Sequence, residues 1–266
     1  MRIPWYAGWP LALAVVYAML CYLASRSVYF PSRYPEGFWE MQRQLGAEDV
    51  WLDTRDGQRI HGWWLARPDT RRVTLFLHGN AGNITHRFSS MSAIAGAGSS
   101  ILVIDYRGYG RSSGRPTERG LYADADAGYD YVIAHGHKPQ DIVLHGESLG
   151  TAVAIDLAAR KPCAGLILEA PFPSARAVAA TVLPVVGPML IRGFDSVQKL
   201  GRVHVPVLVI QGDRDEVIPP PLGQAVFDAV RGRKWFLRVP GAGHNDILET
   251  AGAAYGSRLR GFYREL

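Results

Sequence analysis

Cysteine is scarce in this chain of 266 residues, which contains only Cys21 and Cys163. One lies in an apolar N-terminal run and the other before an expected strand, so they do not form the framework that holds disulfide-rich domains together. A His-Glu-x-x-His motif is also missing, and His135 and His137 have no cysteines or acidic residues nearby at ligand spacing. These absences exclude a disulfide scaffold and predict neither a metal site nor a cofactor.

A concentrated basic segment is absent too, although the formal net charge is +5. The arginines are scattered along the chain and are not interleaved with aromatic residues as in a nucleic-acid-binding surface. We therefore interpret the charge as a solvated surface and expect no nucleic-acid partner. Internal repeats and low-complexity tracts are missing, and the length suits one large domain.

Charge is entirely lacking from Ile3 to Ser25. The core of this run, Trp5 to Ala24, would form about 30 Å of helix, which matches the hydrocarbon thickness of a bilayer. Aromatic residues at both ends resemble interfacial belts. We expect residues 1–30 to form a single-pass membrane anchor and linker. A cleaved signal peptide is the alternative, which the single Arg2 and the poor cleavage site at Tyr22 disfavour.

Beyond the anchor, short β-branched runs alternate with helical patterns. The expected strands are 49–54, 58–66, 73–77, 101–104, the run from Asp141 to Gly146, 165–168, 205–210 and 235–239. The first two flank Arg55-Asp56-Gly57, a sequence typical of a hairpin turn. This alternation predicts one α/β domain over residues 31–266, with a mostly parallel central sheet, helices on both faces and an antiparallel N-terminal hairpin.

The most informative stretch is Gly146-Glu147-Ser148-Leu149-Gly150, which lies between an expected strand and an alanine-rich helix. Gly-x-Ser-x-Gly in this context is typical of a nucleophile elbow. Glycine is needed at 146 and 150 because a Cβ there would collide with the neighbouring strand or helix. We expect the turn to expose the Ser148 hydroxyl above the sheet. The Leu149 amide would lie at a helix N-terminus, where it can stabilise an oxyanion.

Two further side chains are expected at the same edge of the sheet, where open parallel sheets bind their ligands. His244 is the best base candidate among the eight histidines because it follows the last expected strand and has glycines around it. It would take the Ser148 proton and return it to the leaving group. Asp215 would orient its imidazole. Asp213 is the alternative for that role, but we expect it to cap the loop backbone.

The loop after the strand 73–77 should supply the second oxyanion donor. It reads His78-Gly79-Asn80-Ala81-Gly82-Asn83, and its glycines let the backbone approach a ligand closely. We expect the backbone amide of Asn80 to act with that of Leu149, since losing one such donor costs about 10² to 10³ in turnover. His78 is expected to brace this loop without reacting.

Six stretches of the chain together resemble the membrane-anchored alpha/beta-hydrolase-domain serine hydrolases, a family that includes protein depalmitoylases and microbial esterase-like or peptidase-like relatives. They are LHGNAGN (77–83), DYRGYGRSSGRPTERGLYAD (105–124), HGESLGTAVA (145–154), EAPFPS (169–174), GDRDEVIP (212–219) and GAGHND (241–246). The resemblance implies an alpha/beta-hydrolase fold. It also implies a triad of Ser148, Asp215 and His244 with an oxyanion hole formed by Asn80 and Leu149.

An apolar insertion over about residues 172–203 separates two expected strands. We expect it to form a small cap over the site, with a plain core helix as the alternative. The expected activity is hydrolysis of an ester or thioester of a small-molecule or lipid-like acyl substrate. An amidase or peptidase would use the same triad. A non-catalytic binding protein is disfavoured because such proteins usually lose a triad member.

Overall fold

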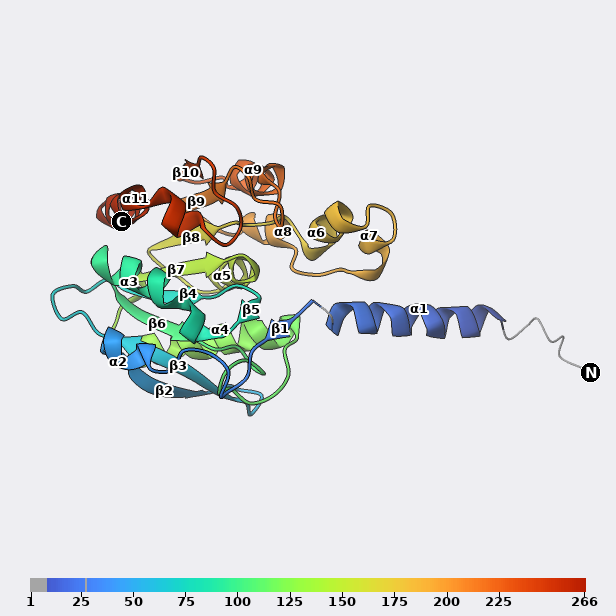
Figure 1. Cartoon of the computed structure of the whole chain (residues 1–266), viewed down its shortest axis with the longest axis horizontal. Coiled ribbons are helices and arrows are strands. Elements are labelled where there is room, and N and C mark those ends of the chain that lie inside the picture. The colour runs from blue at the N-terminus through green and yellow to red at the C-terminus, as the bar shows by residue number, and fades with distance from the viewer. Residues whose placement is uncertain (1–8, 27) are drawn as a thin grey trace, which may run out of the picture.

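The computed structural model describes residues 9–26 and 28–266. An eight-stranded sheet with the strand order β10-β9-β8-β7-β4-β6-β3-β2 forms its centre (Figure 1). Its strands are β2 (Glu48–Asp53), β3 (Arg59–Leu65), β4 (Val73–Leu77), β6 (Ser100–Ile104), β7 (Ile142–Glu147), β8 (Gly165–Glu169), β9 (Val207–Gly212) and β10 (Lys234–Val239).

Six neighbouring strands, from β10 to β6, are parallel. At one edge of the sheet, β3 runs antiparallel to β6. Strand β2 pairs antiparallel with β3, and the two form a hairpin. The mostly parallel sheet with an antiparallel N-terminal hairpin, expected from the sequence, is therefore confirmed.

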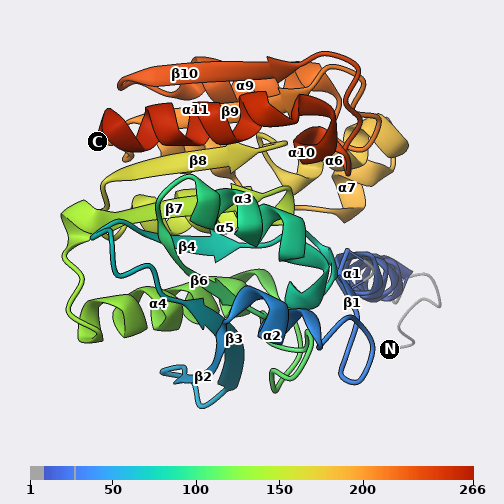
Figure 2. The same cartoon turned by 60° about the vertical axis from the view of Figure 1, so that its left-hand side comes forward.

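Helices cover both faces of this sheet (Figure 2). One face carries α3 (Phe88–Gly96), α10 (Ile247–Ala251) and α11 (Ala253–Arg264), and the other carries α4 (Glu118–Ala134), α5 (Leu149–Ala158), α8 (Ser196–Leu200) and α9 (Pro220–Ala229). On β4, Leu75 and Leu77 point to the α4–α5 face, and Phe76 points to the α3–α11 face. Burial of each such side chain contributes about 1.5–3 kcal/mol. Strands buried on both faces explain the continuous apolar runs in the sequence.

Local features of the sequence explain where two of the elements begin. Helix α4 begins at Glu118 because the Thr117 side chain caps it by accepting from the Gly120 amide at 3.1 Å. Strand β9 begins at Val207, two residues later than expected. Pro206 immediately precedes it and has no N–H to donate to a sheet ladder.

Helix α1 (Trp9–Arg26) projects from the body at the end where α6 (Ala175–Val182) and α7 (Gly187–Leu190) lie (Figure 1). The Tyr17 hydroxyl donates to the Met189 carbonyl at 2.6 Å. Within residues 9–26 and 28–266, no helix combines the length and apolar character that crossing a membrane requires. The expected transmembrane anchor is therefore not supported, and its part before Trp9 lies outside the described residues.

The segment after α1 is attached to the body of the fold. Strand β1 (Phe30–Pro31) pairs in parallel with β5 (Ala81–Gly82), which lies in the loop that follows β4. The chain then forms α2 (Met41–Leu45) before it enters the hairpin. Nothing in the sequence pattern of this segment indicated the pairing, because two residues are too few to show a strand period.

Candidate active site

The turn between β7 and α5 holds Ser148 in a backbone conformation that few residues adopt. Its φ is 50° and its ψ is −115°. A Cβ on Gly146 would lie 2.4 Å from the Gly150 carbonyl oxygen, and one on Gly150 would lie 1.8 Å from the Leu77 carbonyl oxygen. Both positions therefore require glycine, as the sequence analysis expected. The tight packing imposes the strained turn, and such strain persists only where surrounding structure enforces it.

Three side chains from distant parts of the chain meet at this turn. The Nε2 of His244 lies 3.0 Å from the Ser148 Oγ, and its Nδ1 lies 2.8 Å from an Asp215 carboxylate oxygen. Nδ1 donates to the carboxylate, so Nε2 is free to accept the serine proton. The structure thus brings together the three residues that the sequence singled out.

Asp215 is held in place by its own loop. One carboxylate oxygen accepts from the amides of Val217 and Ile218 at 2.9 and 2.7 Å, and the other also accepts from the Gln211 side chain at 3.1 Å. Only 3% of Asp215 is exposed. Asp213 instead accepts from the Gly241 amide at 2.7 Å and bridges two loops. The two aspartates therefore hold the positions that the sequence analysis assigned to them.

The two expected oxyanion donors line the same cavity as Ser148 and His244. Within the described chain, neither the Asn80 nor the Leu149 backbone N–H donates to another residue. Leu149 is the first residue of α5, so its amide also carries the partial positive charge of a helix N-terminus. Both amides are available to a ligand in the cavity.

This cavity has a volume of about 580 Å³, which is ample for a small organic molecule. It lies between the loop of residues 78–83, which we call the oxyanion loop after its expected role, and the region of α6 and α7. Its apolar wall consists of Val28, Phe30, Ala81, Leu149, Phe172, Ala175, Val178, Ala179, Val182, Leu183, Ile191, Phe194, Val217 and Ile218. The apolar segment expected to cap the site therefore supplies much of the wall.

One charged pair interrupts the apolar lining, and the sequence analysis did not anticipate it. Arg87 Nε lies 2.9 Å from a Glu147 carboxylate oxygen, and Arg87 Nη2 donates to the Ala81 carbonyl at 3.0 Å. Burial raises the pKa of Glu147, while the positive charge of Arg87 acts against that rise. The pair joins the residue before Ser148 to the loop that follows β4.

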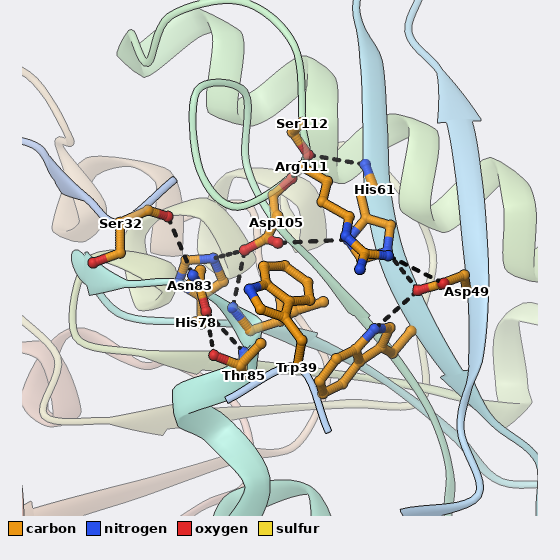
Figure 3. Close-up of polar contacts among 12 residues, drawn as sticks. Ser32, Trp39, Asp49, His61, His78, Asn83, Thr85, Asp105, Arg111 and Ser112 are labelled. Atoms are coloured by element: carbon orange, nitrogen blue, oxygen red, sulfur yellow. Dashed lines mark hydrogen bonds and ion pairs between the residues drawn. The ribbon is translucent and has the colours of Figure 1, made fainter. Parts of the chain in front are cut away.

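A buried polar cluster lies behind the oxyanion loop (Figure 3). Asp105 is completely buried between His61 and His78, at 3.6 and 3.8 Å from their ring nitrogens, and accepts from the Ile84 amide at 2.9 Å. His78 Nδ1 donates to the Gly79 carbonyl at 2.7 Å. Burial lowers the pKa of His78 to about 3, so its ring is neutral near pH 7. His78 thus braces the loop, as expected.

No group of three or more His, Cys, Asp or Glu side chains suited to a metal ion is found among residues 9–26 and 28–266. A serine hydroxyl, an imidazole and a carboxylate that are linked by hydrogen bonds can perform nucleophilic catalysis.

Comparisons with known proteins show which proteins this chain resembles. Residues 68–197 match the model of a family described as serine aminopeptidase, S33. An uncharacterised protein of Mycobacterium tuberculosis is 37% identical over 245 residues, which cover 90% of this chain and 87% of that protein. Mouse alpha/beta hydrolase domain-containing protein 17C is 38% identical over 228 residues, covering 83% of this chain and 69% of that protein.

A solved structure shows the same fold at a greater evolutionary distance. An esterase of Pyrococcus furiosus superimposes with a TM-score of 0.75 at 19% sequence identity, and the match covers 90% of this chain and 98% of the esterase. The fold that the sequence pattern predicted is thereby confirmed.

Proposed function

The chain belongs to the alpha/beta hydrolase family, and on that premise we propose that it is a serine hydrolase that cleaves esters or thioesters of apolar acyl groups. One observation carries the proposal. Ser148, His244 and Asp215 form a continuous chain of contacts of 3.0 and 2.8 Å, and Ser148 and His244 line a largely apolar cavity.

The proposed reaction begins when Ser148 Oγ attacks the substrate carbonyl carbon and its proton passes to His244 Nε2. Asp215 stabilises the resulting imidazolium. The carbonyl oxygen becomes an oxyanion, which accepts hydrogen bonds from the amides of Asn80 and Leu149. The bond to the leaving alcohol or thiol then breaks, and that group takes the proton from Nε2.

The acyl group now remains on Ser148 as an ester. Water attacks its carbonyl carbon while His244 Nε2 takes a proton from the water, and the same two amides stabilise the second oxyanion. Collapse of this intermediate releases the carboxylic acid and returns the proton to Ser148 Oγ. Two moderate barriers thus replace one high barrier.

The apolar lining supports an acyl chain as the group bound next to Ser148. Apolar area removed from water contributes about 25 cal/mol per Å², so each methylene of a bound chain adds to affinity. Neither oxyanion donor selects between oxygen and sulfur leaving groups, since both contact the carbonyl oxygen. The proposal therefore covers esters and thioesters of small-molecule or lipid-like substrates.

An aminopeptidase is the second candidate, because the matching family model is described as serine aminopeptidase. Such an enzyme must bind the positive amino terminus of its substrate, for which a free carboxylate is suited. Glu147 is the carboxylate that lines the cavity, but it is paired with Arg87 at 2.9 Å. We therefore favour hydrolysis of esters or thioesters over aminopeptidase activity.

We also propose that the α1 end of the molecule associates with a lipid bilayer. Val16, Met19 and Leu20 of α1 are each about half exposed, as are Val186 and Met189 in the cap region that α1 contacts. Exposed apolar patches of this kind are typical of interaction surfaces.

Flotation with phosphatidylcholine vesicles tests this membrane association directly. Wild-type protein should rise with the vesicles and a Met19→Ser/Leu20→Ser variant less so; wild-type protein left in the dense fraction contradicts the proposal.

The activity is tested with p-nitrophenyl esters, an acyl thioester and an aminoacyl p-nitroanilide. We expect the wild type to turn over the esters and the thioester, and Ser148→Ala to lose this turnover while keeping its circular dichroism spectrum. Turnover of the anilide alone would identify an aminopeptidase. Equal ester hydrolysis by wild type and Ser148→Ala would contradict the proposed nucleophile.

A further inference from the structure

The side chain of Asn80 is bound from two directions. Its Nδ2 donates to the Val28 carbonyl, and its Oδ1 accepts from the Phe30 amide at 3.4 Å. The same Oδ1 accepts from the Tyr109 hydroxyl at 3.0 Å. Val28 and Phe30 follow α1, whereas Tyr109 follows β6, so this one amide joins two distant segments to the loop that carries it.

The segment after α1 is attached to the same loop at further points. Beside the β1–β5 pairing, the Ser32 amide donates to the Gly82 carbonyl at 3.0 Å. The fully buried Asn83 donates from Nδ2 to the carbonyls of Ser32 and Glu36 at 3.2 and 2.9 Å (Figure 3 shows the contact with Ser32). We call residues 28–36 the arm. The arm lies along the oxyanion loop and contributes Val28 and Phe30 to the cavity wall.

An oxyanion donor must be placed accurately, since its nitrogen has to lie about 2.7–3.1 Å from the oxygen as it becomes negative. The loop from Gly79 to Gly82 contains two glycines, and Gly82 has a φ of 84°. Glycine loses more conformational freedom than any other residue when it is fixed. External contacts are therefore needed to hold the amide between these glycines.

We propose that Asn80 is a positioning residue whose side chain, clamped between the arm and Tyr109, aims its own backbone N–H at the oxyanion. The proposal rests on the proposed function, since it presumes that an oxyanion forms in this cavity. An amide suits the task because it accepts through two lone pairs and donates through its nitrogen at once. Alanine offers neither ability.

A purely structural role of Asn80 makes a different prediction. Loss of structure would reduce the number of working active sites and the melting temperature, but each surviving site would turn over at the normal rate. Loss of positioning leaves the number of sites unchanged and lowers the turnover of every site. A displacement of about 1 Å costs about 10²-fold in rate, so the two cases are well separated.

The test compares wild type, Asn80→Ala, Tyr109→Phe and the double variant in the full chain. Tyr129→Phe is the matched control, because the Tyr129 hydroxyl also donates to one acceptor, the Pro162 carbonyl at 2.7 Å, outside the cavity lining. A fluorophosphonate taken to complete reaction counts the active serines. Then kcat per active serine and KM are measured with p-nitrophenyl butyrate, and Ki with an alkyl trifluoromethyl ketone, which forms a tetrahedral oxyanion adduct.

We expect kcat to fall about 10- to 100-fold in Asn80→Ala and about threefold to tenfold in Tyr109→Phe, with KM changed less than about twofold. Ki for the ketone should rise in parallel with the loss of kcat/KM. The double variant should be no slower than Asn80→Ala alone, because both changes remove the same clamp. Tyr129→Phe should match the wild type.

Wild-type values of kcat per active serine in Asn80→Ala would overturn the proposal, as would a loss of active serines that accounts for the whole decrease. Failure of the proposed function looks different: the wild type itself would show no Ser148-dependent turnover. An active wild type, an inactive Ser148→Ala and an unaffected Asn80→Ala would together reject the positioning role and keep the hydrolase.

Discussion

The two walls of the cavity differ in how they are held. On one side, the oxyanion loop is fixed by the arm, Tyr109 and the cluster around Asp105, and His78 and Asn83 within it are completely buried. On the other side, the region of α6 and α7 exposes 73% of Val182 and 76% of Val185. The first wall is a network of buried polar contacts, and the second is an apolar surface facing solvent.

Under the proposed function, this difference suits the two walls to different roles. Stabilising an oxyanion needs fixed donors, because a preorganised dipole spends no energy on reorientation during the reaction. Binding an acyl chain needs only apolar area, which is non-directional and tolerates movement. The wall formed by the oxyanion loop, here called the fixed wall, should therefore determine the rate of turnover. The wall formed by α6 and α7, here called the exposed wall, should determine which acyl chain is bound.

The largest effect should come from Asp215→Asn, with Asp213→Asn as the matched control two residues away. Asparagine at 215 disturbs the imidazole tautomer, so kcat should fall about 10⁴-fold, whereas the loop contact of Asp213 should matter less than about tenfold. Steady-state hydrolysis of p-nitrophenyl butyrate measures both. Equal losses in the two variants would show that the carboxylate at 215 has no special part in the chemistry.

The second effect concerns acid stability of the fixed wall. The pKa of His78 falls from 6.5 to about 3 on burial. Between these values the unfolded chain binds more protons than the folded one. Stability contributed by His78 is therefore complete above about pH 6.5 and is lost as the pH falls toward 3, with a slope of up to about 1.4 kcal/mol per pH unit.

His78→Asn removes the titrating group but keeps a donor for the Gly79 carbonyl. Urea unfolding between pH 7 and pH 4.5 should show a flatter decline for this variant than for the wild type. Asp105 remains in both proteins, so its own titration does not produce the difference. Parallel curves would mean that His78 is not buried as a neutral ring.

The third effect tests the exposed wall. Ile191 lines the cavity, whereas Val185 on the cap surface does not. Ile191→Trp should reduce the octanoate-to-acetate ratio of kcat/KM by about tenfold. The larger side chain would fill space that the octanoyl chain needs, and losing the space for one methylene in an apolar pocket changes the free energy of substrate discrimination by about 1–3 kcal/mol. Val185→Trp should leave the ratio unchanged. An unchanged ratio in both variants would place the acyl chain elsewhere.

The smallest effect is expected for a substitution at an exposed residue of the cap, which is compared with a substitution in the sheet core. Val185→Ser should change the free energy of unfolding by less than about 0.5 kcal/mol, because the side chain is exposed. Phe76→Ala, in the sheet core below the site, should cost about 3–5 kcal/mol. Urea denaturation measures both, and a large loss in Val185→Ser would mean that the cap is packed more firmly than its exposure indicates.

Much of the fold was predictable because its signals are local. Alternating strand and helix patterns gave the parallel sheet, and Arg55-Asp56-Gly57 marked the hairpin between β2 and β3. The positions of Ser148 and His244 followed from strand order, since residues after parallel strands meet at one edge. The bounds of every expected strand lie within two residues of the observed ones, and the largest difference, at β9, falls beside Pro206.

The contacts that support the site were not predictable in this way. The arm meets the oxyanion loop across about fifty residues of sequence, as the bond from the Phe30 amide to Asn80 shows, and it has no periodic pattern. The Arg87–Glu147 pair and the cluster around Asp105 likewise join residues on different elements. Long-range polar contacts depend on the final packing and leave no signature in a single sequence.

The central claim is that Ser148 is a nucleophile activated by His244. The most direct measurement is labelling by a fluorophosphonate followed by mass-spectrometric identification of the modified residue in wild type, Ser148→Ala and His244→Ala. The account predicts modification at Ser148 in the wild type, none in Ser148→Ala, and labelling slowed at least 100-fold in His244→Ala. Wild-type protein that stays unlabelled, or that is labelled equally fast without His244, would contradict it.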